Sequence, residues 1–171
     1  MARFSVAFGL SNSQASLDFV DVDLSTDTPL YIDPYAIQIR DDEWSAKCGD
    51  AIRSFFTEVL TALRSDNVAR ASHLMSRLGE PNETFLGQSI GTPSGRGVGR
   101  GKANQFASAL RNSRAFRTGV IGDISEAELF IYGVGPDMIS DLTTNIIRGH
   151  LADYTKQQCD LHGIPTRIVR S

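Results

Sequence analysis

The chain has 171 residues, of which 41% are hydrophobic, and its formal net charge is −3. This size predicts a single globular domain over residues 1–171, and the acidic balance argues against a protein that coats nucleic acid nonspecifically, although a local basic patch remains compatible with it. No apolar run approaches the ~20 residues that span a bilayer, and the N-terminus lacks a signal-peptide pattern, so we expect a cytoplasmic protein without membrane contact.

The N-terminal part of the chain predicts strands. Apolar residues alternate with polar or small residues in the segments 3–8 and 17–24, and 29–33 is a short third candidate after a turn-forming STDT segment. We interpret the three segments as an antiparallel sheet. Asp33 then closes the third strand, immediately before Pro34.

Two helices are predicted next. Between Asp42 and about Ser65, apolar residues recur at i, i+3 and i+4 spacing, which indicates a helix with one face in the core. A second helix is predicted for residues 67–78 and ends at Gly79 before a proline. Together these patterns predict an α+β fold, in which N-terminal antiparallel strands pack with a core of about four helices.

A glycine-rich basic segment, GTPSGRGVGRGKANQF, ends the long stretch without periodicity at residues 81–101. Glycine lets backbone N–H groups approach an anion, and a helix is expected to begin just after the segment at Ala103. The spacing matches neither the P-loop nor the dinucleotide fingerprint, so phosphate binding is predicted without a named motif. The predicted substrate-binding residues of the segment are Arg96, Gly97, Gly99, Arg100, Gly101 and Lys102. The alternative is an exposed loop kept soluble by its charges.

Carboxylates at predicted strand ends indicate a metal site. Glu126 and Glu128 are two residues apart in SEAELFIY, which we interpret as a strand, so they share one face. Together with Asp33 and Asp141 they form the predicted ligand set for Mg²⁺ or Mn²⁺. The segment lacks the lysine that restriction-endonuclease-like nucleases carry after the second acid, so no membership of that group is inferred. The alternative is that the strand acids face solvent and discourage aggregation at a sheet edge.

One long helix is predicted for residues 137–162, between a Gly-Pro break and Gly163. Most of its circumference is apolar, and a narrow polar stripe remains. The stripe consists of Asp141, Thr144, Asn145 and Arg148, spaced i, i+3, i+4 and i+7. Asp141 and Arg148, with Asp33 from the sheet, are the predicted catalytic residues. Asn145 is predicted to bind substrate. The alternative is an internal polar network that fixes the helix register.

The remaining features are less specific. The ending GIPTRIVRS predicts the start of a short strand, so the chain is interpreted as a fragment or as a subunit that lacks its C-terminal completion. Cys48 and Cys159 lack CxxC spacing and predict two reduced thiols, and the histidines lack the spacing of a zinc site.

Three function classes fit these patterns. The preferred hypothesis is a metal-dependent phosphodiesterase or nuclease, in which carboxylates bind the metal and the glycine-rich basic segment contacts the phosphates of nucleic acid or a nucleotide. The second is a noncatalytic module that binds a nucleotide or another anion. The third is an interaction subunit whose polar helix completes the surface of a protein partner or of a second copy of the chain.

Overall fold

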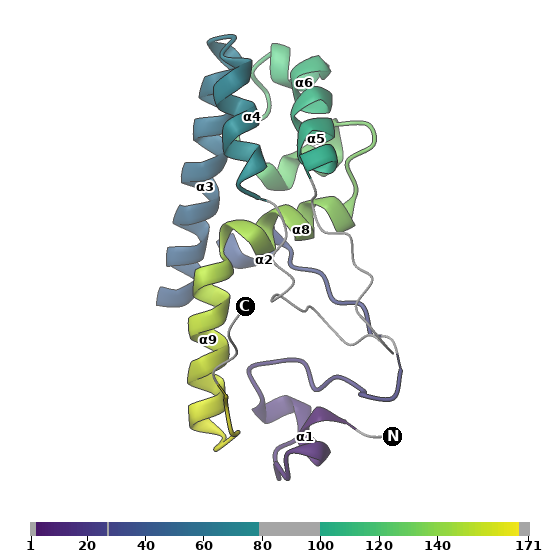
Figure 1. The fold of residues 1–171 in the computed structure, drawn as a ribbon, viewed down its shortest axis with the longest axis vertical. Helices are drawn as coiled ribbons and strands as arrows, with labels where there is room; N and C mark the ends of the chain where they lie inside the picture. Colours follow the sequence, from purple (N-terminus) through teal and green to yellow (C-terminus); the bar gives the residue numbers. More distant parts are fainter. Residues whose placement is uncertain (1–2, 27, 79–99, 168–171) are drawn as a thin grey trace. The chain divides into compact units, whose positions relative to one another are not determined.

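The computed structural model describes residues 3–26, 28–78 and 100–167, without the side chains of residues 100, 102 and 103. Within these ranges the fold is all-α (Figure 1). The elements are α1 (Phe4–Ala7), the 3-10 helix η1 (Gln14–Ser16), α2 (Pro34–Gln38), α3 (Glu43–Arg64), α4 (Val68–Ser76), α5 (Arg100–Asn112), α6 (Arg114–Arg117), the 3-10 helix η2 (Ile124–Glu126), α7 (Ala127–Phe130), α8 (Pro136–Ile146) and α9 (Arg148–Leu161).

The predicted α+β class is therefore wrong. Residues 3–8 contain α1, and β structure in the described ranges is limited to isolated bridge residues, including an antiparallel bridge between Arg3 and Asp23. In the segment 17–24, side chains take the place of a strand ladder. The buried Asp21 carboxylate accepts from the backbone N–H and the hydroxyl of Ser5, both at 2.8 Å. Side-chain hydrogen bonds to Ser5, 16 residues earlier in the chain, thus hold this segment without a sheet.

The segment around Glu126 is also helical and not the predicted strand. The Asp123 side chain accepts from the backbone N–H of Ser125 at 2.8 Å, and the Glu126 side chain accepts from the backbone N–H of Asp123 at 3.2 Å. This reciprocal capping box begins η2, which leads directly into α7. The two acids that looked like strand residues therefore belong to a helix start.

The long helix predicted for residues 137–162 is divided at Ile147 into α8 and α9. Two polar side chains bond back to the carbonyl four residues earlier: Thr143 to Ile139 at 2.7 Å and Asn145 to Asp141 at 2.9 Å. Such bonds compete with the backbone ladder, which explains a break without proline. After α9, residues 164–167 form no strand, and the rest of the predicted C-terminal strand lies outside the described residues.

The chain divides into two compact units, each with its own contacts. Unit 1 consists of Met1–Leu30, Phe85–Gly95 and Leu151–Ser171, and unit 2 consists of Tyr31–Thr84 and Arg96–His150. The expectation of a single domain over residues 1–171 stays a prediction. Among the described residues, no helix has the length and apolar character needed to cross a membrane.

Unit 2 is built around α3, α4 and α5, which lie side by side in Figure 1. Asp42 caps α3 by accepting from the backbone N–H of Ser45 at 2.8 Å, and Asn67 caps α4 by accepting from that of Arg70 at 3.0 Å. The two helices predicted for residues 42–65 and 67–78 are thus confirmed as α3 and α4, with ends within about two residues of the prediction.

The core of unit 2 connects the long helices with the segments that follow α6. The rings of Phe56 on α3 and Phe106 on α5 have centroids 6.4 Å apart. The largest side chains with less than 2% exposure are Ile52, Phe56, Val59, Met75, Phe106, Leu110, Ile121, Ile124, Leu142, Thr143 and Ile147. The apolar residues at helical spacing therefore do face a common interior.

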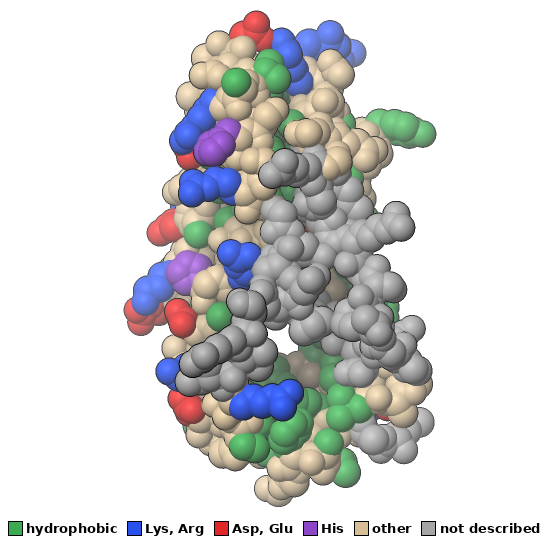
Figure 2. Space-filling view, in the orientation of Figure 1, with side chains coloured by type: hydrophobic (Ala, Val, Ile, Leu, Met, Phe, Trp, Pro, Cys, Tyr) green, Lys and Arg blue, Asp and Glu red, His purple; other side chains and the backbone are tan. Residues whose placement is uncertain are grey.

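Unit 1 is held by a small aromatic cluster. The Phe4 ring lies 4.6 Å from Phe8 and 5.6 Å from Phe19, and the Phe19 ring lies 5.7 Å from the His162 imidazole in an edge-to-face arrangement. Figure 2 shows apolar side chains gathered in the region of α1. This cluster joins the N-terminal segment to the residues that follow α9.

Candidate functional site

Two hydrogen bonds in unit 2 bring together the elements that carry the predicted acids. The backbone N–H of Ile32 donates to the Ser140 hydroxyl at 2.8 Å, which sets the residues before α2 against α8. The Gln38 side chain at the end of α2 donates to the Asp123 carboxylate at 2.7 Å, just before η2. We define the candidate functional site as this junction of α2, η2 and α8.

Two of the predicted metal ligands have structural roles in the junction. Asp33 caps α2 by accepting from a backbone N–H in its first turn at 2.8 Å. Glu126 accepts from two backbone N–H groups just before η2, at 2.8 and 3.2 Å. Glu128 is exposed on α7, and Asp141 is half-buried on α8 and takes part in a further interaction. These hydrogen bonds orient the carboxylates of Asp33 and Glu126, and each uses one of the two carboxylate oxygens.

The four predicted ligands do not converge. Among the described residues, no group of three or more His, Cys, Asp or Glu side chains is placed to hold a metal ion. A strand would place Glu126 and Glu128 on one face, because strand residues two apart share a face. In a helix, residues two apart are separated by about 200° around the axis, so they point in different directions.

The polar stripe predicted along residues 137–162 loses its register at the break. Asp141 and Asn145 lie one turn apart on α8, and the Asn145 amide bonds to the backbone of Asp141. Arg148 is exposed at the start of α9 and forms no ion pair with Asp141 within the described part of the chain. Thr144 is only 6% exposed, and its hydroxyl has no hydrogen-bond partner among the described residues. A buried hydroxyl without a partner carries a desolvation cost.

The glycine-rich basic segment falls mostly outside the described residues, where Arg96, Gly97 and Gly99 lie. Its last members, Arg100, Gly101 and Lys102, form the first turn of α5, so the helix begins earlier than the predicted start at Ala103. Gly101 is exposed.

Sequence reasoning missed two polar residues of the junction. Ser140 is 2% exposed and supplies the bond to Ile32, yet it belonged to neither the apolar rows nor the polar stripe. Gln38 was missed as well. A serine beside the apolar Ile139 on a buried helix was the available signal, because a buried hydroxyl needs a partner.

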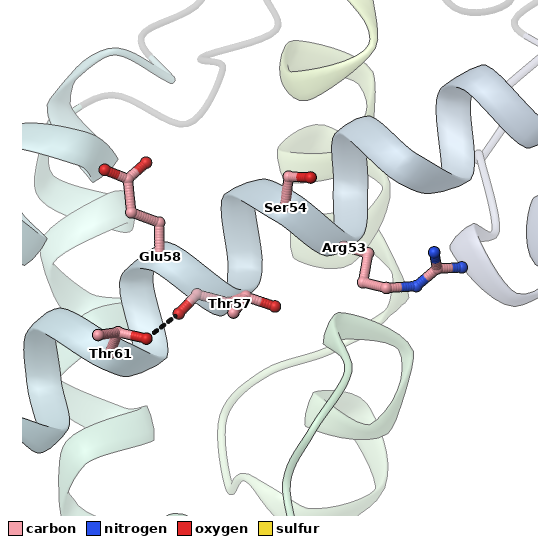
Figure 3. A pocket seen from close by; sticks show the side chains of 5 residues that line it. All are labelled: Arg53, Ser54, Thr57, Glu58 and Thr61. Carbon is pink, nitrogen blue, oxygen red and sulfur yellow. Dashed lines mark hydrogen bonds between the residues drawn. The ribbon is translucent and has the colours of Figure 1, made fainter.

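A shallow hollow on α3 is the weaker candidate. Figure 3 shows its five lining side chains, all from this helix: Arg53, Ser54, Thr57, Glu58 and Thr61. Arg53 pairs with Asp50 at 2.9 Å, and the Thr61 hydroxyl donates to the Thr57 carbonyl at 2.8 Å. Figure 2 shows charges of both signs along this face. Paired surface charges of this kind are typical of a solvated helix face.

Large apolar side chains are exposed on both sides of the junction. Tyr35 on α2 is 58% exposed, and Ile39, directly after α2, is 65% exposed. On α7 and directly after it, Leu129 is 77% exposed and Tyr132 is fully exposed. α2 packs against η2, which runs into α7. Two short elements that each adjoin η2 thus present apolar side chains to solvent.

Comparison with known proteins places the chain in a family. Residues 9–171 match the family described as Domain of unknown function (DUF8370), and the chain belongs to it. No curated protein and no solved structure matches the chain. The family description names no activity, so a functional hypothesis has to rest on the residues of the chain.

Proposed function

We propose that this chain is a noncatalytic interaction subunit that binds a protein partner through unit 2. The observation that carries the proposal is the exposure of large apolar side chains on α2 and around α7, represented by Tyr35, Ile39, Leu129 and Tyr132. Single exposed apolar residues are ordinary on protein surfaces, but contiguous ones mark interaction sites. Here they occupy two elements that are connected through η2 and the Gln38–Asp123 hydrogen bond.

The chemistry of the junction supports binding over catalysis. Asp33 and Glu126 each orient a helix start through backbone N–H groups, which is a structural use of a carboxylate. Tyrosine in addition combines a large apolar ring with a hydroxyl, and it is enriched where proteins bind one another. Tyr35 and Tyr132 are therefore suited to a surface that is exposed to solvent in the free chain and buried in a complex.

Site-specific photo-crosslinking tests the proposal. A benzoylphenylalanine residue at Tyr35 or Tyr132 is expected to give a discrete crosslinked product in native extract, because these positions lie in the proposed interface. The matched control is the same residue at Thr57, which is exposed on the charged face of α3. Equal crosslinking at all three positions, or none at any of them, would contradict the proposal.

A metal-dependent phosphodiesterase or nuclease in the cytoplasm is the second candidate. The observation in its favour is the Ile32–Ser140 hydrogen bond, since it sets the segments of Asp33 and Asp141 beside one another. A nucleic acid or nucleotide would be the substrate, and Mg²⁺ or Mn²⁺ the cofactor.

Thermal melting tests this candidate. A ligand that binds only the folded chain raises the melting temperature, so millimolar Mg²⁺ or Mn²⁺ should raise it relative to EDTA. Asp33→Asn keeps a good helix cap, and it should remove the metal-dependent rise while leaving the melting temperature in EDTA nearly unchanged. Asp50→Asn on α3 is the control and should retain the rise. The absence of any rise in the wild-type chain would remove the candidate.

A further inference from the structure

The short helix α6 presents two arginines to solvent. Ser113 caps it: its hydroxyl accepts from the backbone N–H of Phe116 at 3.0 Å and donates to the carbonyl of Leu110 at 2.9 Å. Phe116 is half-buried, whereas Arg114 and Arg117 are exposed. Residues three apart in a helix are neighbours on one face, so the two guanidinium groups share the outward face of α6.

No carboxylate balances these two charges within the described part of the chain. The nearby Arg111 already pairs with Asp66, and Arg64 donates to the carbonyl of Ile121 at 3.4 Å. Like charges on one face of a helix destabilise it. Among the described residues, Arg114 and Arg117 therefore form a cationic pair without a compensating carboxylate. Figure 2 shows Lys or Arg side chains gathered at this end of unit 2.

An exposed apolar residue lies next to the pair. The chain turns at Gly119, which has a φ of 76°, and the backbone N–H of Val120 then donates to the carbonyl of Ala115 at 2.9 Å. This bond holds Val120 against α6, where its side chain is 56% exposed. Two cations with an adjoining apolar group match a segment that carries carboxylates beside apolar side chains.

We infer that Arg114, Arg117 and Val120 bind an acidic, amphipathic segment of a protein partner. The inference rests on the proposed interaction function and specifies the chemistry of the partner. A protein is favoured over nucleic acid because the chain carries 20 acidic and 17 basic side chains, which opposes attraction to a polyanion at long range. Short-range pairing with individual carboxylates does not depend on the net charge in this way.

Fluorescence anisotropy with two labelled probes tests the inference. The first probe is a 15-residue peptide with Glu and Leu at helical spacing, and the second is a 15-nucleotide oligothymidine. The wild-type chain is expected to bind the peptide at low salt. Arg114→Glu combined with Arg117→Glu should weaken this binding about tenfold, because each substitution turns an attraction into a repulsion. The matched control, Lys156→Glu with Arg167→Glu, changes the net charge equally and should bind within about twofold of wild type.

Three outcomes would overturn the inference: no peptide binding by the wild-type chain, equal weakening in both charge-reversal variants, or a loss confined to oligothymidine, which would assign the surface to nucleic acid. Arg114→Gln with Arg117→Gln serves as the folding control and should melt no lower than wild type, because it removes a repulsion. If crosslinking at Tyr35 and Tyr132 persists while charge reversal has no effect, only this inference fails. If crosslinking is also absent, the proposed function fails with it.

Discussion

The hydroxyl of Ser140 accepts a hydrogen bond from the backbone N–H of Ile32 at 2.8 Å, although the two residues are 108 positions apart in the chain. Ser140 is almost fully buried on α8, and Ile32 lies in the irregular segment before α2. Residues 29–33 carry no strand or bridge in the described part of the chain, so the serine supplies the acceptor that a strand ladder would have supplied. The bond fixes where α2 begins relative to α8.

Replacement of Ser140 by Ala is expected to destabilise the chain by ~1–3 kcal/mol, because it leaves the part-buried N–H of Ile32 without its acceptor. Urea unfolding followed by circular dichroism measures this change. Ser54→Ala on the exposed face of α3 is the control, and it should change stability by no more than ~0.5 kcal/mol. Equal stabilities of the two variants would show that the bond is not formed in solution.

We expect the Asp42 carboxylate to make part of the folding stability depend on pH in the acid range. A hydrogen bond from Arg40, with further bonds from the backbone and hydroxyl of Ser45, lowers the pKa of this carboxyl from 3.8 to about 2. A lowered folded-state pKa means that its contribution is fully present above pH 3.8 and is lost as the pH falls towards 2. Thermal melting between pH 2 and pH 5 should therefore show a decline to which Asp42 contributes.

Asp42→Asn separates this titration from the capping of α3. Asparagine is as good an N-cap as aspartate but does not ionise, so the variant should melt somewhat below wild type at pH 5, approach wild type towards pH 2, and lose less stability between pH 4 and pH 2. Exposure of both partners to solvent and the resulting screening limit the size of the effect. Parallel pH profiles for the two proteins would refute the assignment.

The helices that the sequence predicted correctly are those in which two independent signals agree. For α3, the apolar spacing between Asp42 and Ser65 coincides with a capping aspartate at its start. For α4, Asn67 supplies the cap in the same way. Agreement of local propensity with the core-facing pattern leaves little room for another structure.

The strands were mispredicted because alternation alone does not distinguish a sheet from an irregular segment. In the 17–24 segment, the buried Asp21 carboxylate accepts a hydrogen bond from Ser5, and the Asp21 N–H donates to the Gln14 side chain at 2.7 Å. Near α7, Asp123 and Glu126 have the spacing of a capping box, a signal that was available in the sequence and was interpreted as strand acids.

The candidate site could be predicted only in part. Sequence reasoning paired Asp33 with Asp141, and their segments do lie together, but the contact that joins them is made by Ser140. Long-range contacts of this kind depend on tertiary packing, which no local pattern records. The sequence did not predict the exposure of the apolar residues on and beside α2 and α7, because the exposure of a residue depends on how its neighbours pack around it.

We expect the Asp21 carboxylate to contribute to the local stability of unit 1. Asp21→Ala would leave the two Ser5 donors without their acceptor in a buried place, at an expected cost of ~1–3 kcal/mol. Hydrogen exchange followed by mass spectrometry should show faster exchange of the α1 amides, because those amides depend on this contact. Asp18→Ala is the control, since its side chain is exposed and its contact with Tyr154 uses only the backbone carbonyl. Unchanged protection of α1 in the Asp21 variant would contradict the prediction.

The two cysteines should differ sharply in reactivity. Cys48 is fully buried on α3, and burial, assisted by the charge of Asp42, raises the pKa of its thiol from 9.0 to about 11. Because the thiolate is the reactive form, only on the order of a thousandth of Cys48 is ionised at pH 8, and that fraction is also shielded from reagent. Cys159 on α9 is partly accessible. Ellman's reagent at pH 8 should therefore modify one thiol rapidly in the native chain and the second only on unfolding in guanidinium chloride, with the rapid phase absent in Cys159→Ser. Two thiols that react at the same rate in the native wild-type chain would mean that Cys48 is not held in the core of unit 2.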